Sequence, residues 1–281
     1  MNSATTFKYF PQAVLTVLML VVVLTMSQTA AQLSVTWSSG QGAYSSGWLV
    51  CLLFGYTLWI RQERVFDCKT QPQIIYLALI AVAAFFGIQG SSESLQYLAL
   101  PLFAVGIYSL IFGTRAGFQL SLVMAIVLFA LPIWSWLQPP LQTLASVSVA
   151  AFFDFIQTPV FLEGNRITVP AGIFEVKNGC SGLNYFLVAN CTAYTASLWA
   201  ELKGPKFVAQ MVAATAFAIV VNWLRIGTII YVGNATDMQS SLVTDHVTFG
   251  WILFVCLFVP YVFFVLPHSP SAMATKKGET L

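Results

Sequence analysis

Eight long apolar stretches are the feature that most constrains what this chain can fold into. Each reaches or approaches the roughly 20 residues that a helix needs to cross the hydrocarbon of a bilayer. They cover residues 11–29, 47–60, 74–89, 95–112, 117–137, 183–202, 207–231 and 249–266. Only 8% of the 281 residues are charged and 58% are hydrophobic, which excludes a water-soluble fold. We therefore predict an all-α polytopic membrane protein, a single membrane domain over residues 1–281 with about eight transmembrane helices.

Lysine and arginine are unevenly distributed between the alternate loops. With the N-terminus inside, the inner side collects Lys8, Arg61, Arg64, Lys69, Arg115, Lys203, Lys206, Lys276 and Lys277. The outer side collects only Arg166 and Lys177. The positive-inside rule therefore predicts that both termini are cytoplasmic. Thr29-Ala30-Ala31 also resembles a small-residue cleavage site, so the first span is alternatively a cleaved signal peptide, which leaves the remaining topology unchanged.

The outer connection over residues 138–182 is too long to be a featureless loop. Leu141–Ile156 is moderately apolar, follows two prolines and carries one acidic residue. This pattern predicts a re-entrant or surface helix and not a ninth span. Val160–Val169 alternates β-branched and polar residues around Gly164-Asn165, which predicts a short β-hairpin on the outer surface.

One cysteine stands at a position suited to chemistry. The five cysteines are odd in number and contain no CxxC pair, so neither a disulfide framework nor a zinc site is indicated. Cys180 lies where the outer loop enters the sixth span, so the first helical amides and the helix dipole favour its thiolate. Gly179 and Gly182 leave space for a substrate backbone to approach the sulfur. The alternative is a small buried residue at a helix entry.

Arg225 lies inside the seventh span, about 9 Å below its predicted outer end. Arginine near mid-membrane costs about 2.5–3.5 kcal/mol on insertion scales, so its side chain should face protein or a polar cavity. The structural alternatives are snorkelling to the outer surface or a buried ion pair with Asp154, Glu175 or Asp245. Asn222, one turn earlier, extends the polar stripe on the same helix face.

His246 follows Asp245 just before the last span. The other histidine, His268, falls in the cytoplasmic tail in this topology, so His246 is the one imidazole available at the outer face. A lone interfacial histidine is also a common passive polar cap. Asp245 is a candidate to orient the ring.

These residues form an ordered pattern in the second half of the chain. The pattern is Glu175-Val176, Cys180-Ser181-Gly182-Leu183, Asn222-Trp223-Leu224-Arg225, and His246 ahead of Gly250-Trp251. In order and spacing it resembles the exosortase and archaeosortase family from about Gly164 onward. Many relatives have a larger polar or basic residue at the position of Asn184. We expect this difference to affect substrate specificity more than the chemistry of the reaction.

The resemblance implies a site and a substrate class. The catalytic residues would be Cys180, Arg225 and His246, supported by Ser181, Gly182, Asn222, Asp245 and Glu175. The substrates would be membrane-anchored proteins whose C-terminal sorting signal has a recognition motif, a transmembrane helix and a basic tail. The protein would lie in the bacterial inner membrane, with its active site on the periplasmic side.

We therefore expect a cysteine endopeptidase or transpeptidase that acts through a thioester, with arginine at the oxyanion and histidine as general acid and base. The lipid bilayer and the membrane-anchored substrate are the expected partners. No metal or organic cofactor is implied, and the net charge of +2 gives no reason to expect nucleic acid. A small-molecule transporter and a non-catalytic envelope assembly factor remain alternatives. The transporter alternative makes a different prediction from the enzyme, because a transport route should have polar residues at midplane depth in several helices.

Overall fold

The computed structural model describes residues 27–39, 42–66 and 93–267, together with Ala13, Thr16, Val17, Leu20 and Ile80. Most of the predicted first span and nearly all of the third lie outside the described residues. The chain divides into two compact units, one of Met1–Gly40 with Tyr44–Ile133, the other of Gln41–Ala43 with Trp134–Leu281. The candidate site residues all belong to the second unit. That the chain is one membrane domain stays a prediction.

The described part of the first unit is helical. Its elements are α2 (Ser27–Ser38), α3 (Gly47–Ile60), α4 (Gln62–Phe66), α6 (Glu93–Phe112), α7 (Thr114–Met124) and the 3-10 turn η1 (Val127–Phe129). Gly113, at φ 86°, adopts the left-handed backbone that separates α6 from α7. The fully buried Tyr108 of α6 donates a hydrogen bond of 3.1 Å to the Val65 carbonyl. This bond satisfies the tyrosine hydroxyl inside an apolar core.

The predicted fifth span, residues 117–137, is not one continuous helix. The α7 helix ends at Met124, η1 ends at Phe129, and a further 3-10 turn, η2 (Ser135–Leu137), begins only after Pro132. The α-helix therefore ends eight residues before Pro132, and a proline by itself does not account for the break, because Pro101 lies inside the continuous helix α6. Hydropathy alone does not reveal this break.

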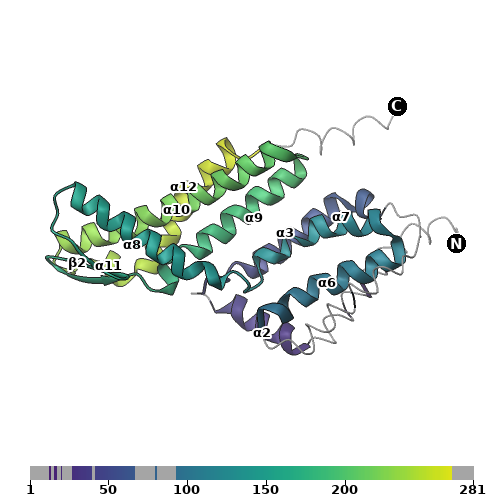
Figure 1. Ribbon diagram of the computed structural model, residues 1–281, viewed down its shortest axis with the longest axis horizontal. Helices are drawn as coiled ribbons and strands as arrows, with labels where there is room; N and C mark the ends of the chain where they lie inside the picture. The colour runs from purple at the N-terminus through teal and green to yellow at the C-terminus, as the bar shows by residue number, and fades with distance from the viewer. Residues whose placement is uncertain are drawn as a thin grey trace. The chain divides into compact units, whose positions relative to one another are not determined.

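The second unit combines helices with a small sheet. Its elements after η2 are α8 (Gln138–Phe155), β1 (Phe161–Glu163), β2 (Arg166–Val169), β3 (Gly172–Glu175), the 3-10 turn η3 (Asn178–Cys180), α9 (Leu183–Trp199), α10 (Gly204–Ala235), α11 (Ser241–Thr244) and α12 (His246–Phe264). In Figure 1, α9 and α12 lie along α10, and α8 lies nearer the sheet. The predicted helix over 141–156 is therefore present, whereas its surface or re-entrant position stays a prediction.

The predicted hairpin is confirmed, and the sheet has one strand more than predicted. β1 pairs antiparallel with β2 in a register that sets Glu163 opposite Arg166, so Gly164 and Asn165 form the two-residue turn. Gly164 has φ 60°, which a tight hairpin turn requires. β2 also pairs antiparallel with β3 through a second short turn. The sequence did not predict β3 because its four residues carry little periodic signal.

Long apolar helices support a membrane location. Glu93–Phe112, Gly204–Ala235 and His246–Phe264 are long and apolar enough to cross a bilayer, and Gly47–Ile60 and Thr114–Phe129 are shorter apolar helices. The α9 helix, with 17 residues, falls just below the usual spanning length. The described residues thus form a mostly helical membrane fold, and the count of eight spans is not confirmed.

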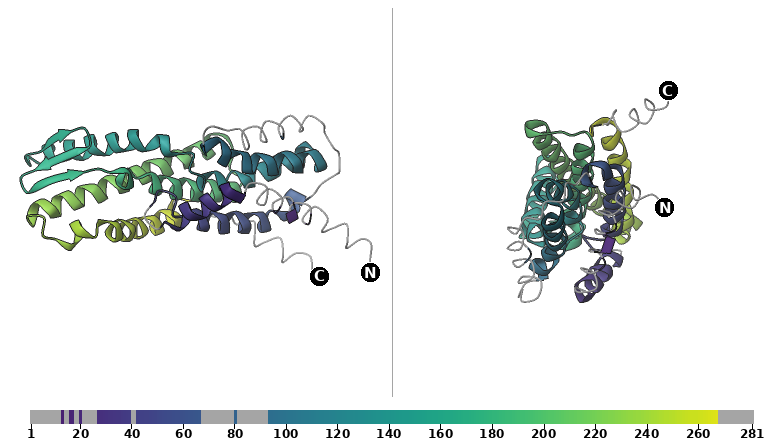
Figure 2. Two further views of the ribbon diagram at one scale, coloured as in Figure 1. Left: turned by 90° about the horizontal axis from the view of Figure 1, so that it is seen from below. Right: turned by 90° about the vertical axis from the view of Figure 1, so that its right-hand side faces the viewer.

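The α10 helix organises the second unit. Its 32 residues extend about 48 Å, far enough to contact both the membrane helices and the sheet. Its first part packs with α9 and α12 in a core that contains Ala218, and the Tyr185 and Phe254 rings stack there at 4.5 Å. Its later part packs against α8 and β3, and Figure 2 shows these elements together at one end of the unit. The candidate residues lie where the two parts of α10 meet.

Candidate active site

Cys180 lies between the sheet and α9. It ends the 3-10 turn η3, and its amide donates to the Lys177 carbonyl at 2.8 Å. Ser181 and Gly182 separate it from α9, so it precedes the helix and is not part of it. Cys180 is a free cysteine of intermediate exposure that packs beside Trp223 against an apolar core. The residue is therefore partly accessible.

The two glycines that flank Cys180 differ in what they allow. Gly182 has φ 85°, and a Cβ there would lie 2.8 Å from Cγ of Asn222, whereas a Cβ on Gly179 would meet open space. Gly182 thus provides both the left-handed turn into α9 and the close approach of Asn222. Asn222 is 1% exposed, and its Nδ2 donates to the Cys180 carbonyl at 3.0 Å. The asparagine holds the backbone of the candidate nucleophile.

A second polar connection fixes the other end of η3. Gln142, buried on α8, donates through Nε2 to Oδ1 of Asn178 at 2.9 Å and accepts from Nδ2 of Asn165 at 3.5 Å. The Asn165 carbonyl in turn accepts from the Val176 amide at 2.9 Å. The hairpin turn, α8 and the Cys180 segment are therefore joined. Sequence reasoning missed Gln142, although a glutamine in a moderately apolar helix was a usable signal.

Arg225 lies three residues after Asn222 on α10 and is 6% exposed. Its Nη2 donates to the His246 carbonyl at 3.2 Å, and its Cζ lies 5.8 Å from the centre of the Tyr185 ring. A Cβ on Gly250 would collide with its Nε, so this glycine lets α12 approach the guanidinium. The cation is held by a carbonyl, an aromatic face and a close helix contact.

The ion pairs weighed for Arg225 are not formed among the described residues. Glu175 and Asp154 are exposed side chains, and Glu175 stands opposite Arg166 in the β2–β3 register. The Asp245 carboxylate accepts from the Thr248 amide at 3.3 Å and caps α12. We expected Asp245 as a candidate to orient His246. Its carboxylate instead accepts a hydrogen bond from a backbone amide in the first turn of α12.

His246 is the first residue of α12, and its Nδ1 lies 3.2 Å from the Val243 carbonyl. A carbonyl only accepts, so in this contact Nδ1 carries the proton and Nε2 of the neutral ring is the proton acceptor. A backbone carbonyl thus takes the orienting role expected of Asp245. The imidazole has the tautomer that a general base through Nε2 needs.

Tyr185 connects the parts of the site and was missed by sequence reasoning. Its hydroxyl donates to the Gly250 carbonyl at 2.7 Å, and its ring lies against the Arg225 guanidinium. A tyrosine close after the cysteine in an apolar helix needs a partner for its hydroxyl, which was the available signal. Ser181, another predicted residue, accepts at 3.3 Å from the amide of Leu183, the first residue of α9.

These contacts bring the ordered motifs together through one face of α10. Asn222 holds the Cys180 carbonyl and Arg225 holds the His246 carbonyl, so the cysteine and histidine segments meet at adjacent turns of one helix. Within the described part of the chain, no group of three or more His, Cys, Asp or Glu side chains could hold a metal ion.

A model of the transmembrane exosortase family matches residues 36–263. The chain belongs to the transmembrane exosortase family. The predicted resemblance is confirmed, and the match begins far ahead of Gly164, so it includes most of the first unit, which carried little specific signal. No significant match was found among curated proteins or solved structures. The exosortase match contains Cys180, Arg225 and His246.

Proposed function

We propose that this exosortase is a membrane cysteine endopeptidase or transpeptidase that cleaves the C-terminal sorting signals of exported proteins at the outer face of the bacterial inner membrane. The observation that carries the proposal is the pair of bonds from adjacent turns of α10, Asn222 to the Cys180 carbonyl and Arg225 to the His246 carbonyl. The segments that carry the cysteine and the histidine are thereby bound at adjacent turns of the helix that carries the arginine, which supports the proposal.

The proposed reaction has two steps. His246 takes the proton of the Cys180 thiol through Nε2, the resulting thiolate attacks a substrate carbonyl carbon, and the oxyanion is stabilised by Arg225 and by amides near the start of α9. The C–N bond then breaks, His246 gives a proton to the leaving amine, and a thioester remains. In the second step His246 takes a proton from water or from an acceptor nucleophile, which attacks the thioester and releases the thiolate.

The length of α10 suits a reaction at the membrane boundary. From Gly204, beside Lys203, to Arg225 the helix rises about 31 Å, close to the hydrocarbon thickness of about 30 Å. The helix ends at Ala235, four residues after the predicted end of the span, so Arg225 would lie at the outer boundary and not near mid-membrane. A substrate anchored by its own helix would present a peptide bond at this depth, and anchoring raises its local concentration.

Reconstitution with a membrane-anchored substrate tests the proposal. Cys180→Ala should abolish processing while membrane insertion stays normal, and Cys180→Ser should trap or greatly slow the acyl intermediate. Cys256→Ala is the matched control, because Cys256 is a free, exposed cysteine on α12 away from the site, and it should process normally. Mass spectrometry of Cys180 during turnover should show the substrate acyl group. Processing by Cys180→Ala at the rate of the unmodified enzyme would overturn the proposal.

Thiol labelling tests the sidedness. A membrane-impermeant maleimide added outside intact cells should label Cys180 in a Cys256→Ala background. Labelling only after the membrane is opened would place the site on the inner face.

A further inference from the structure

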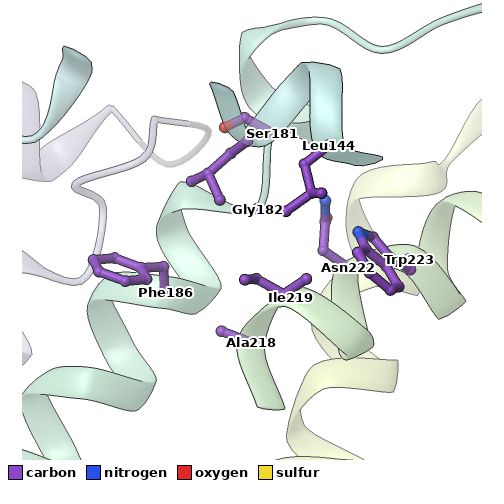
Figure 3. A pocket seen from close by; sticks show the side chains of 9 residues that line it. Leu144, Ser181, Gly182, Phe186, Ala218, Ile219, Asn222 and Trp223 are labelled. Carbon is purple, nitrogen blue, oxygen red and sulfur yellow. The ribbon is translucent and has the colours of Figure 1, made fainter. Parts of the chain in front are cut away.

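A narrow pocket lies directly beside the Cys180 segment (Figure 3). Its walls come from α8, the start of α9 and α10, and its lining residues are Leu141, Leu144, Ser181, Gly182, Phe186, Ala218, Ile219, Asn222 and Trp223. Most of these side chains are apolar. Asn222 and Ser181 are the polar side chains in the lining, and the Ser181 hydroxyl oxygen already accepts from the Leu183 amide.

Asn222 uses only one end of its amide within the protein. Its Nδ2 donates to the Cys180 carbonyl, while its Oδ1 is buried and has no hydrogen-bond partner. The orientation of the amide follows from this contact, because a carbonyl oxygen cannot accept from Oδ1. A buried acceptor left without a donor is unfavourable by about 1–3 kcal/mol, and Asn222 lines the pocket, so a donor on a bound molecule that reached Oδ1 would relieve this cost.

The surroundings indicate which kind of donor fits. The neighbouring walls are Ala218, Ile219 and Leu144, which offer no charge to hold a cationic or strongly polar group. A backbone N–H is a neutral donor that enters an apolar cleft beside a small side chain. The same asparagine holds the Cys180 backbone, so a peptide bound to Oδ1 would be positioned relative to the nucleophile.

Resting on the proposed function, we propose that Asn222 Oδ1 accepts a backbone N–H of the substrate next to the scissile bond, and that the pocket restricts that substrate residue to a small side chain. Asn222 is then a substrate-binding residue as well as the support of Cys180. Ile219 lines the pocket, and a bulky substrate residue would collide with it.

An ester scan of the substrate tests the hydrogen bond. Each backbone N–H near the cleavage point is replaced by oxygen in turn, and kcat/KM is measured for the unmodified enzyme and for Asn222→Ala in vesicles. At one position the replacement should lower kcat/KM about tenfold with the unmodified enzyme, which corresponds to one good neutral hydrogen bond. With Asn222→Ala the same replacement should change kcat/KM little. Equal losses in both enzymes at every position would mean that Asn222 only supports Cys180.

A size exchange tests the pocket without altering Asn222. Two substrates are compared, one with alanine and one with a larger residue at the identified position. In Ile219→Ala the ratio of kcat/KM for the larger residue to kcat/KM for alanine should rise by about tenfold. Val220→Ala is the matched control, because Val220 is 47% exposed and does not line the pocket. An unchanged preference in Ile219→Ala would overturn the subsite. In either failure Cys180-dependent cleavage would persist, so the proposed function is judged separately by Cys180→Ala.

Discussion

Gly182→Ala is the substitution for which the structure gives the sharpest expectation. A non-glycine residue held in the left-handed region is unfavourable by about 1–2 kcal/mol. The added methyl would also lie 2.8 Å from Cγ of Asn222, and overpacking of this kind costs about 1–3 kcal/mol. Together we expect a loss of about 2–5 kcal/mol in the free energy of unfolding. Displacement of Asn222 should also release the Cys180 carbonyl and lower processing.

Gly179→Ala is the matched control within the same motif. Gly179 has no positive φ, and a Cβ there meets open space, so its unfolding free energy should change by less than about 0.5 kcal/mol. Measured in the same detergent, the thermal unfolding midpoint of Gly182→Ala should lie at least about 5 °C below that of Gly179→Ala. Equal midpoints for the two variants would refute the reasoning on both the backbone angle and the contact with Asn222.

Three further substitutions probe the supports of the site. Gly250→Ala places a methyl group against Nε of Arg225 and should lower processing more than tenfold. The control is Gly227→Ala, whose Cβ meets open space; it should process normally and gain about 0.5–1 kcal/mol of helix stability. Similar activities of the two variants would contradict the contact between Gly250 and Arg225. Arg225→Lys keeps the charge but loses the planar fork of donors, so the kcat/KM of this variant should be at least about tenfold below that of the unmodified enzyme. An unchanged kcat/KM in Arg225→Lys would show that the positive charge alone suffices. Gln142→Leu removes the hydrogen bond to Asn178 and should lower the free energy of unfolding by about 1–3 kcal/mol; an unchanged thermal midpoint would mean that the link carries no stability.

Much of the helical arrangement was predictable because membrane insertion depends on local hydrophobicity. The predicted stretch 47–60 coincides with α3, and the stretches 95–112, 207–231 and 249–266 differ from α6, α10 and α12 by a few residues at their ends. The hairpin was predictable for a similar reason, since a glycine at a two-residue turn is a local requirement. The stretch 117–137 shows the limit, because it is apolar enough to span and yet its α-helix ends at Met124.

The sequence by itself determined the chemical groups of the candidate site. These groups are a cysteine between glycines, a lone arginine in an apolar span and a single histidine before the last span, and the arginine stands out because an ionisable side chain is unfavourable in a membrane without a partner. Their order also sufficed to indicate the family that the match over residues 36–263 shows.

Only the tertiary structure decided how these groups are held. Asn222 reaches the Cys180 carbonyl across 42 positions of sequence, and Tyr185 reaches the Gly250 carbonyl across 65. Such contacts depend on which helix faces meet and on where a missing Cβ lets them approach, and neither is a property of a single segment. For the same reason Asp245 caps a helix and a carbonyl orients His246, although their order in the chain suggested a pair.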